Sequence, residues 1–318
     1  MKHTLSITII LIVMFLIAQS IGLLAVNSYI DPEEEDGLRP LPGGVERPDV
    51  TEDAAPWLLI IGVLIGTMII FMLIRLNAVR AWGVWFSISI FVLSMLGLSA
   101  FIPVYYAIPI SILFAYLKVS KKNISWIIKN MPELFIYAGI AVVFAPLLSV
   151  WGAAILLVLI SLYDMFAVWK SKHMVSLARF QLDSGRFAGF NISYNTNKNR
   201  PSLKEVNTNN KARPDIRSIS NNKSAKTNNA NEQKPSDSKG MRSAILGGGD
   251  VAFPLLYSSA LLMAIGWNYA IASTIGASIG LAILLYYSVK DRFYPAMPFI
   301  AVGCFAGAAM VWIFNAII

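Results

Sequence analysis

The sequence has 318 residues, of which 56% are hydrophobic and only 14% are charged. A soluble protein carries about 25% charged residues, so this composition excludes a pair of soluble domains and indicates a polytopic membrane protein. A single cysteine, Cys304, excludes an internal disulfide, and two histidines, His3 and His173, are too few for a protein-only zinc site. The net charge of +8 would fit nucleic-acid binding, but its distribution along the chain decides how it is interpreted.

Nine apolar segments are long enough to cross a bilayer, whose hydrocarbon core of about 30 Å needs about 20 helical residues. The sequence therefore predicts an all-α fold with nine transmembrane helices. They are expected at residues 4–26, 56–74, 81–99, 101–117, 133–150, 151–169, 244–264, 269–289 and 294–317. The joins at residues 99–102 and 149–152 carry no charge, which indicates tight hairpins at the membrane edge.

The first segment has one alternative interpretation. Lys2 before an apolar stretch, and Ala25 near its end, are also features of a cleaved signal peptide. The apolar run of about 22 residues exceeds the roughly 7 to 15 of a signal peptide, so we expect a retained helix.

The basic residues lie on one side of this nine-helix arrangement. Lys and Arg are kept on the cytoplasmic side during insertion, so their distribution sets the orientation. Of the 26 basic residues, 24 fall in connections expected to be cytoplasmic, whereas the first outer connection has nine acids against Arg39 and Arg47. The N-terminus is therefore expected in the cytoplasm and the C-terminus outside.

A polar stretch divides the chain. Residues 191–240 are rich in Asn, Ser and Lys and lack a hydrophobic period, which predicts a disordered cytoplasmic linker. The expected organisation is a six-helix membrane part at 1–190 with an acidic outer loop at 27–55, the linker, and a three-helix membrane part at 241–318. The linker's basic charge leaves contact with anionic lipid or nucleic acid as alternatives. Tyr194 is its only aromatic residue, so no nucleic-acid partner is expected.

Two acidic residues lie inside apolar helices. The other 16 of the 18 acids, Glu133 among them, are assigned to the outer loop or to cytoplasmic connections, whereas Asp164 and Asp250 are embedded in the sixth and seventh segments. An acid at this depth is costly and marks a functional site by default. Asp164 lies six residues before Lys170 and Asp250 eight residues after Arg242. Both are thus about 9 to 12 Å from the cytoplasmic edge.

The matching depths predict that the two carboxylates face each other. Two carboxylates in a low-dielectric site do not both ionise readily, so such a pair shares one proton. One carboxylate then activates water and the other polarises a carbonyl. Two alternatives stay open on this ground alone: each acid is neutral and satisfied by a nearby polar group, or the pair conducts protons or ions in a transporter or channel.

Three successive glycines, Gly247, Gly248 and Gly249, directly precede Asp250. Such a run forms helix poorly, which predicts an irregular backbone that is open to another chain and to water. Close packing of helices is the alternative reason for small residues here. Two prolines at the start of the ninth segment, Pro295 among them, likewise leave backbone groups unpaired.

The residues around the two acids form three motifs, Tyr163-Asp164 in the sixth segment, Gly247-Gly248-Gly249-Asp250 in the seventh, and Pro295-Ala296-Met297 at the start of the ninth. Their order, helix assignment and spacing resemble those of the presenilin and signal-peptide-peptidase family of intramembrane aspartyl proteases. The resemblance covers all nine segments and implies a presenilin-like fold in which Asp164 and Asp250 are catalytic. It also implies that the other residues of the three motifs shape the active site or bind substrate. Met297 stands where the family has the Leu of its P-A-L motif, an exchange of apolar residues of similar volume.

The resemblance also implies substrates and surroundings. A cytoplasmic N-terminus matches the presenilin-like members, which implies cleavage of single-pass transmembrane helices whose N-terminus is outside. The expected partners are such helices and membrane lipid; separate partner subunits are not implied, and homo-oligomerisation is left open. We expect the cell membrane as the location of a prokaryotic or archaeal homologue, and an endomembrane for a eukaryotic one.

Other intramembrane protease chemistries do not fit the sequence. A zinc type needs H-E-x-x-H, and neither His3 nor His173 is followed by Glu. A serine type needs a buried His base, but both histidines lie outside the predicted spans. Aspartyl hydrolysis needs no metal and no cofactor, and none is expected. The substrate must unwind locally, and its freed backbone could pair as an added strand near the three glycines and Pro295.

Overall fold

The computed structural model describes residues 5–34, 37–76, 78–120, 124–171, 187–195, 241–288 and 294–317. Within these ranges the chain forms nine α-helices and two β-strands. The helices are α1 (Leu5–Tyr29), α2 (Ala55–Arg75), α3 (Val79–Ser99), α4 (Val104–Val119), α5 (Trp126–Phe144), α6 (Val150–Phe166), α8 (Gly248–Ala264), α9 (Trp267–Tyr287) and α10 (Met297–Ile317). The strands are β1 (Gly189–Asn195) and β2 (Met241–Gly247). The all-α prediction therefore holds apart from one small two-stranded sheet.

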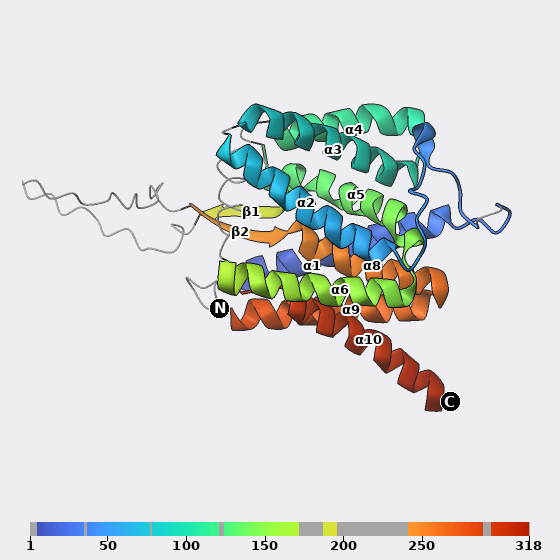
Figure 1. Cartoon of the computed structure of the whole chain (residues 1–318). Coiled ribbons are helices and arrows are strands. Elements are labelled where there is room, and N and C mark those ends of the chain that lie inside the picture. Colours follow the sequence, from blue (N-terminus) through green and yellow to red (C-terminus); the bar gives the residue numbers. More distant parts are fainter. Residues whose placement is uncertain are drawn as a thin grey trace, which may run out of the picture. The chain divides into compact units, whose positions relative to one another are not determined.

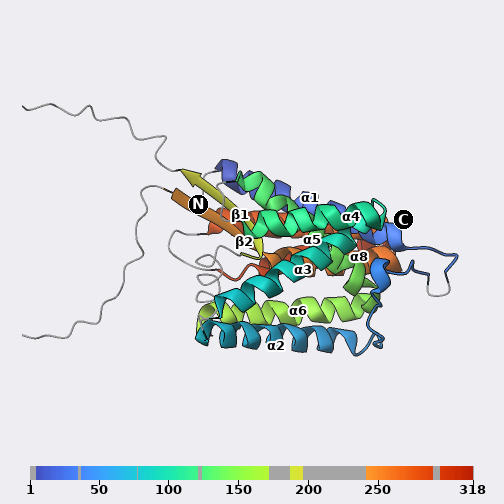
Figure 2. The ribbon, with the colours of Figure 1, turned by 90° about the horizontal axis from the view of Figure 1, so that it is seen from above.

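The helices run side by side along a common direction, and the strands lie at one end of the bundle (Figures 1 and 2). Among the described residues, seven helices are long and apolar enough to cross a membrane. The apolar helices α4 and α8 are shorter, with 16 and 17 residues. Each of the nine predicted spans thus corresponds to an apolar helix, seven of them of full spanning length.

Three predicted boundaries were wrong. The seventh span was expected from Ala244, but the chain is extended as far as Gly247, because this segment pairs with β1. Gly248 and Gly249 are the first two residues of α8, so the irregular backbone predicted for the three glycines was wrong for these two. The linker was expected from residue 191, yet β1 continues to Asn195. The fifth helix begins at Trp126 instead of Glu133, because the charged residues taken as its edge are buried as a pair.

The predicted six-helix and three-helix parts form a single compact unit, Met1–Ile192 with Ala244–Ile318. In it, α8 packs against α1, α5 and α6, and α10 packs against α6 and α9. The second unit is Ser193–Ser243. Of the predicted linker, residues 196–240 lie outside the described residues.

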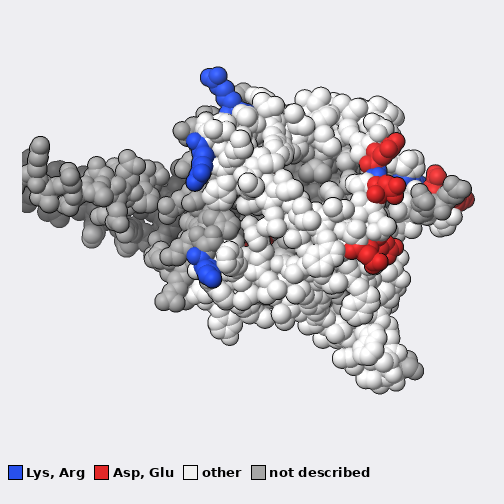
Figure 3. Space-filling view, viewed as in Figure 1, with Lys and Arg blue, Asp and Glu red and all other residues white. Residues whose placement is uncertain are grey.

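The charged side chains of the described surface gather at opposite ends of the helices (Figure 3). On the face shown, acidic side chains lie at one end and basic side chains at the other. In the sequence, exposed basic residues stand at helix ends: Arg75 at the end of α2, Arg80 at the start of α3 and Lys170 just after α6. The uncharged helix surface between them exposes large apolar side chains, including Trp151, Met68 and Val302. This is the surface expected of a protein surrounded by lipid.

Helices α9 and α10 pack with their backbones in contact. Gly276 on α9 faces Gly303 on α10, while Gly280 meets the backbone of Phe299 and Gly307 that of Ala272; the two glycines of each helix have the G-x-x-x-G spacing. A Cβ atom on Gly307 would lie 2.0 Å from the carbonyl oxygen of Ala272, so only hydrogen fits at this position. Small residues permit this close approach, which supplies the packing energy that hydrophobic burial cannot supply within lipid.

The close contact of α9 and α10 predicts that alanine has different effects on stability at a packed glycine and at an unpacked one. Gly307→Ala should destabilise the protein by about 1–3 kcal/mol through overpacking, seen as a lower melting temperature in detergent. Gly66→Ala on α2 is the matched control, because it lies in a third G-x-x-x-G where nothing approaches a Cβ within 4 Å. The control should be neutral or stabilising, since alanine favours helix by about 1 kcal/mol over glycine. Equal melting temperatures for the two variants would contradict the packing described.

Candidate active site

Asp164 lies in the last turn of α6 and is buried, with 5% of its surface exposed. Its Oδ2 atom accepts a hydrogen bond of 3.2 Å from the backbone N–H of Met297. That N–H is free to donate because Met297 is the first residue of α10, where backbone donors have no partner within the helix. The start of α10 therefore holds the carboxylate of Asp164 in place.

Asp250 is the third residue of α8 and is partly exposed. Gly247 caps this helix, and its backbone N–H is bonded by the Asp250 carboxylate. An acid three residues after the cap is a favourable arrangement, both for the cap's free N–H and for the helix dipole. A Cβ atom on Gly247 would lie 3.1 Å from Oδ2 of Asp250, so a side chain there would crowd the carboxylate.

The packing of α6 against α8 brings the two carboxylates within electrostatic range of each other. The start of α10 joins them through the N–H of Met297. Pro295 and Met297 are buried, and Ala296 is half-buried. Tyr163 is half-buried beside Asp164. The three motifs, separated by up to 133 residues in the sequence, thus meet at one place in the fold.

A buried polar face of α5, which the sequence analysis missed, lies against β1. Glu133 is 2% exposed and forms an ion pair of 2.5 Å with Lys118 of α4, whose Nζ also donates to the carbonyl oxygen of Gly189. Asn130 bonds both backbone groups of Asn191, at 2.9 and 3.1 Å. Side chains of α4 and α5 therefore occupy one edge of β1.

Tyr137 extends this face toward Asp250. Its ring packs edge-on against Phe190 of β1, with centroids 5.5 Å apart, and its hydroxyl lies 3.4 Å from the place of a Cβ on Gly248. The spacing of Asn130, Glu133 and Tyr137, at i, i+3 and i+7, is the signal that could have revealed one polar helix face. It was missed because Glu133 had been assigned to a connection on account of its charge.

The strands carry this support to Asp250. The N–H of Gly248 donates to the carbonyl oxygen of Ala188, which joins the end of β2 to the start of β1 in an antiparallel arrangement. Among the described residues, the other edge of β2 has no recorded backbone partner. The residues just before Asp250 are thus fixed on the β1 side and open on the other.

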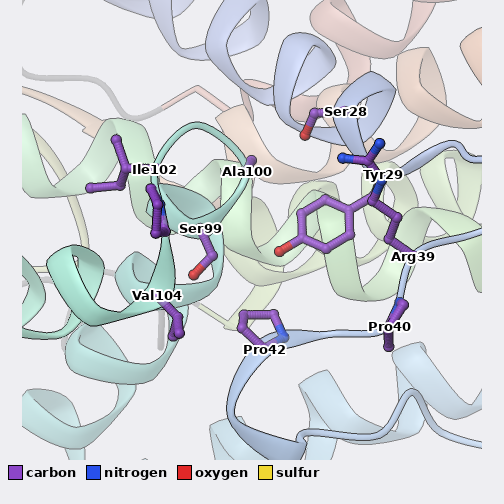
Figure 4. Close-up of a pocket in the computed structure, with 10 residues that line it drawn as sticks. Ser28, Tyr29, Arg39, Pro40, Pro42, Ser99, Ala100, Ile102 and Val104 are labelled. Atoms are coloured by element: carbon purple, nitrogen blue, oxygen red, sulfur yellow. The ribbon is translucent and has the colours of Figure 1, made fainter.

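A cavity of about 270 Å³ lies elsewhere, at the acidic end of the bundle (Figure 4). Tyr29 at the end of α1, Arg39 and Pro42 of the connection between α1 and α2, and Ser99 of the α3–α4 hairpin line it. It contains no residue of the three motifs. Within the described ranges, no group of three or more His, Cys, Asp or Glu residues is arranged to hold a metal ion.

A model of the family described as signal-peptide peptidase, presenilin aspartyl protease matches residues 46–317. The chain belongs to this family. It is an intramembrane aspartic endopeptidase and a multi-pass integral membrane protein, which confirms the resemblance seen in the sequence. The partners of the family are transmembrane substrates within the membrane.

Solved structures have the same fold. Two structures of a presenilin family intramembrane aspartate protease, in space groups C222 and P2, match with TM-scores of 0.56 and 0.57. Their sequence identities are 18% and 17%, over 95% and 96% of this chain and 99% and 96% of theirs. No curated protein matches the sequence.

The ion pair of α4 and α5 predicts a strong dependence of stability on its partners. Glu133→Leu leaves the ammonium of Lys118 buried without its counter-ion, and should cost about 3–5 kcal/mol of unfolding free energy. The double variant Lys118→Met/Glu133→Leu should recover most of this loss, because it removes both charges together. Thermal unfolding in detergent measures both effects.

Asp31→Asn is the control for this prediction. It disrupts the exposed pair with Arg39, where solvent screens the charges, and should leave the melting temperature almost unchanged. A double variant no more stable than Glu133→Leu would show that the charges are not coupled.

Proposed function

We propose that this protease hydrolyses peptide bonds within single-pass transmembrane helices, with Asp164 and Asp250 as its catalytic pair. The observation that carries the proposal is the meeting of the two carboxylates at helix ends, where Asp164 is bonded to the N–H of Met297 in another motif and Asp250 to the N–H of Gly247 in its own. The transporter alternative has no comparable support, because family membership points to proteolysis.

The chemistry requires one proton shared by the pair. The ionised carboxylate takes a proton from a water molecule as the oxygen of that water attacks the scissile carbonyl carbon. The protonated carboxylate donates its proton to the carbonyl oxygen. The tetrahedral intermediate then collapses: the C–N bond breaks, the leaving nitrogen takes up a proton from the protonated carboxylate, and one hydroxyl of the intermediate gives its proton to the other carboxylate, which restores the singly protonated pair. The products are a carboxylic acid and an amine, and the protein forms no covalent bond to the substrate.

The free edge of β2 suits an unwound substrate. A peptide bond in a helix is shielded by its hydrogen bonds, so the scissile segment must become extended before attack. Because α4 and α5 side chains occupy the outer edge of β1, an extended segment has the edge of β2 at Ala244–Gly247 to pair with. A strand added there would continue past Gly247 toward Asp250.

Removal of either carboxylate tests the catalytic pair. Asp164→Asn and Asp250→Asn should each lower kcat on a model transmembrane peptide by about 10⁴-fold or more, because the pair acts as a unit. Asp31→Asn, an exposed acid of the outer connection, is the matched control and should keep full activity. Peptide products from either site variant at more than a few per cent of the wild-type rate would refute the assignment. Ion or proton flux into liposomes that either variant abolishes, without peptide products, would support a transporter.

Orientation determines which substrates the pair can reach. We infer a cytoplasmic N-terminus and an external C-terminus, since the exposed basic residues gather at the end where α1 begins and the acids at the opposite end (Figures 1 and 3). Cysteine labelling in intact cells should modify a cysteine added after Ile318 without permeabilisation, and one added before Lys2 only after it. Labelling of both ends under one condition would mean that a helix does not span.

A further inference from the structure

The first helix has a buried amide close to its middle. Gln19 has no exposed surface, although α1 is the most apolar span of the described chain, with a mean hydropathy of 2.8. Its Nε2 atom donates a hydrogen bond of 2.9 Å to the backbone carbonyl oxygen of Val251. Val251 is the residue that follows Asp250, so this bond ties α1 to the turn that carries a proposed catalytic carboxylate.

α1 is an internal part of the bundle. It packs against α5, α8 and α9, and Phe15 and Ala18 are fully buried in these contacts. At Gly22 the side chain of Leu255 fits so closely that a Cβ would lie 2.3 Å from its Cδ2 atom. The family model begins only at residue 46, so the match leaves α1 out. The structure nevertheless places α1 directly behind the first turns of α8.

Within α8 itself, the restraint on the first turn is the bond between the Asp250 carboxylate and the N–H of Gly247. The cap of the helix, Gly247, provides no side-chain hydrogen bond, and the two glycines that follow give a flexible first turn. Pro254 lacks an N–H, so the carbonyl of Asp250 has no donor four residues later in the helix. A hydrogen bond from outside the helix is therefore effective at this turn.

Burying the amide of Gln19 at this position has a free-energy cost. Its Oε1 atom is buried without a hydrogen-bond partner among the described residues, and an unsatisfied buried acceptor destabilises a fold. An apolar side chain of the same length would pack inside the bundle without that cost. What the amide alone provides is the donor to Val251.

We propose that Gln19 is a positioning residue of the active site, and that α1 serves the reaction by fixing the first turn of α8. The proposal rests on the proposed function, because Gln19 acts only through Asp250. Misplacing a catalytic group by about 1 Å costs about 10²-fold in rate. Loss of the bond should therefore affect turnover more than stability or substrate binding.

The test replaces Gln19 with methionine, which keeps the length of the side chain and removes its hydrogen bond. Gln19→Met should lower kcat about 10- to 100-fold with KM within about 2-fold of wild type, and should leave the melting temperature equal or higher. Thr8→Val is the matched control: Thr8 is buried on the same helix, and its replacement should leave kcat unchanged. Gln19→Leu is the second variant, with the same expectation.

The outcomes separate this proposal from the function on which it rests. If wild-type protein cleaves the peptide and Gln19→Met retains kcat within about 2-fold, the positioning role is refuted while the protease assignment stands. If the Met and Leu variants both fail to fold, Gln19 serves the fold rather than the reaction, which also overturns the proposal. If wild-type protein yields no products at all, the proposed function fails first.

Discussion

The absence of water around a buried charge is the constraint on which this structure depends. In lipid a carboxylate or ammonium that has no partner costs several kcal/mol, so each one must be matched by a specific group. Lys118 and Glu133 match each other, and Asp164 is matched by a backbone N–H at the start of α10. Asp250 is held by the N–H of Gly247, and the repulsion between the two acids is an unfavourable interaction at this place. A shared proton would relieve that repulsion, and the proposed hydrolysis needs the same proton.

The two acids of the candidate site could be predicted from the sequence, because they depart from the apolar composition of membrane spans. Asp164 and Asp250 stand out because acids are rare in apolar spans, and their equal depth along helices of opposite direction predicted their meeting. The helices were predictable for the same reason, since length and apolarity are local properties. The separation of charge is local as well, which is why the acidic and basic ends in Figure 3 agree with the distribution along the chain, while the orientation inferred from it stays a prediction.

The supporting residues could not be predicted in this way. Lys118 and Glu133 were counted with the connections, because a charge near a helix end is normally solvated; only the packing of α4 against α5 shows that they neutralise each other. Gln19 carries no charge, and its partner is a backbone oxygen 232 residues away. The strands were missed because their hydrogen bonds join segments on either side of a long polar stretch. In each case the pairing depends on the tertiary structure, and composition does not record it.

The position of the site at helix ends reconciles hydrolysis with a membrane. A backbone inside lipid must be helical or otherwise paired, and irregular backbone is tolerated only where it is covered by protein or lines a watery cavity. Asp164 lies at the end of α6, just before a π-helical turn at Ala167–Ser171, while Asp250 and Met297 lie at the starts of α8 and α10. The helix starts therefore supply the N–H groups, those of Met297 and Gly247, that bond the two carboxylates near the basic end of the bundle. Farther along the bundle, α9 and α10 pack through close glycine contacts. Under the proposed function, an unwound substrate would be cleaved at the depth of the two acids, because the proposed catalytic groups lie there.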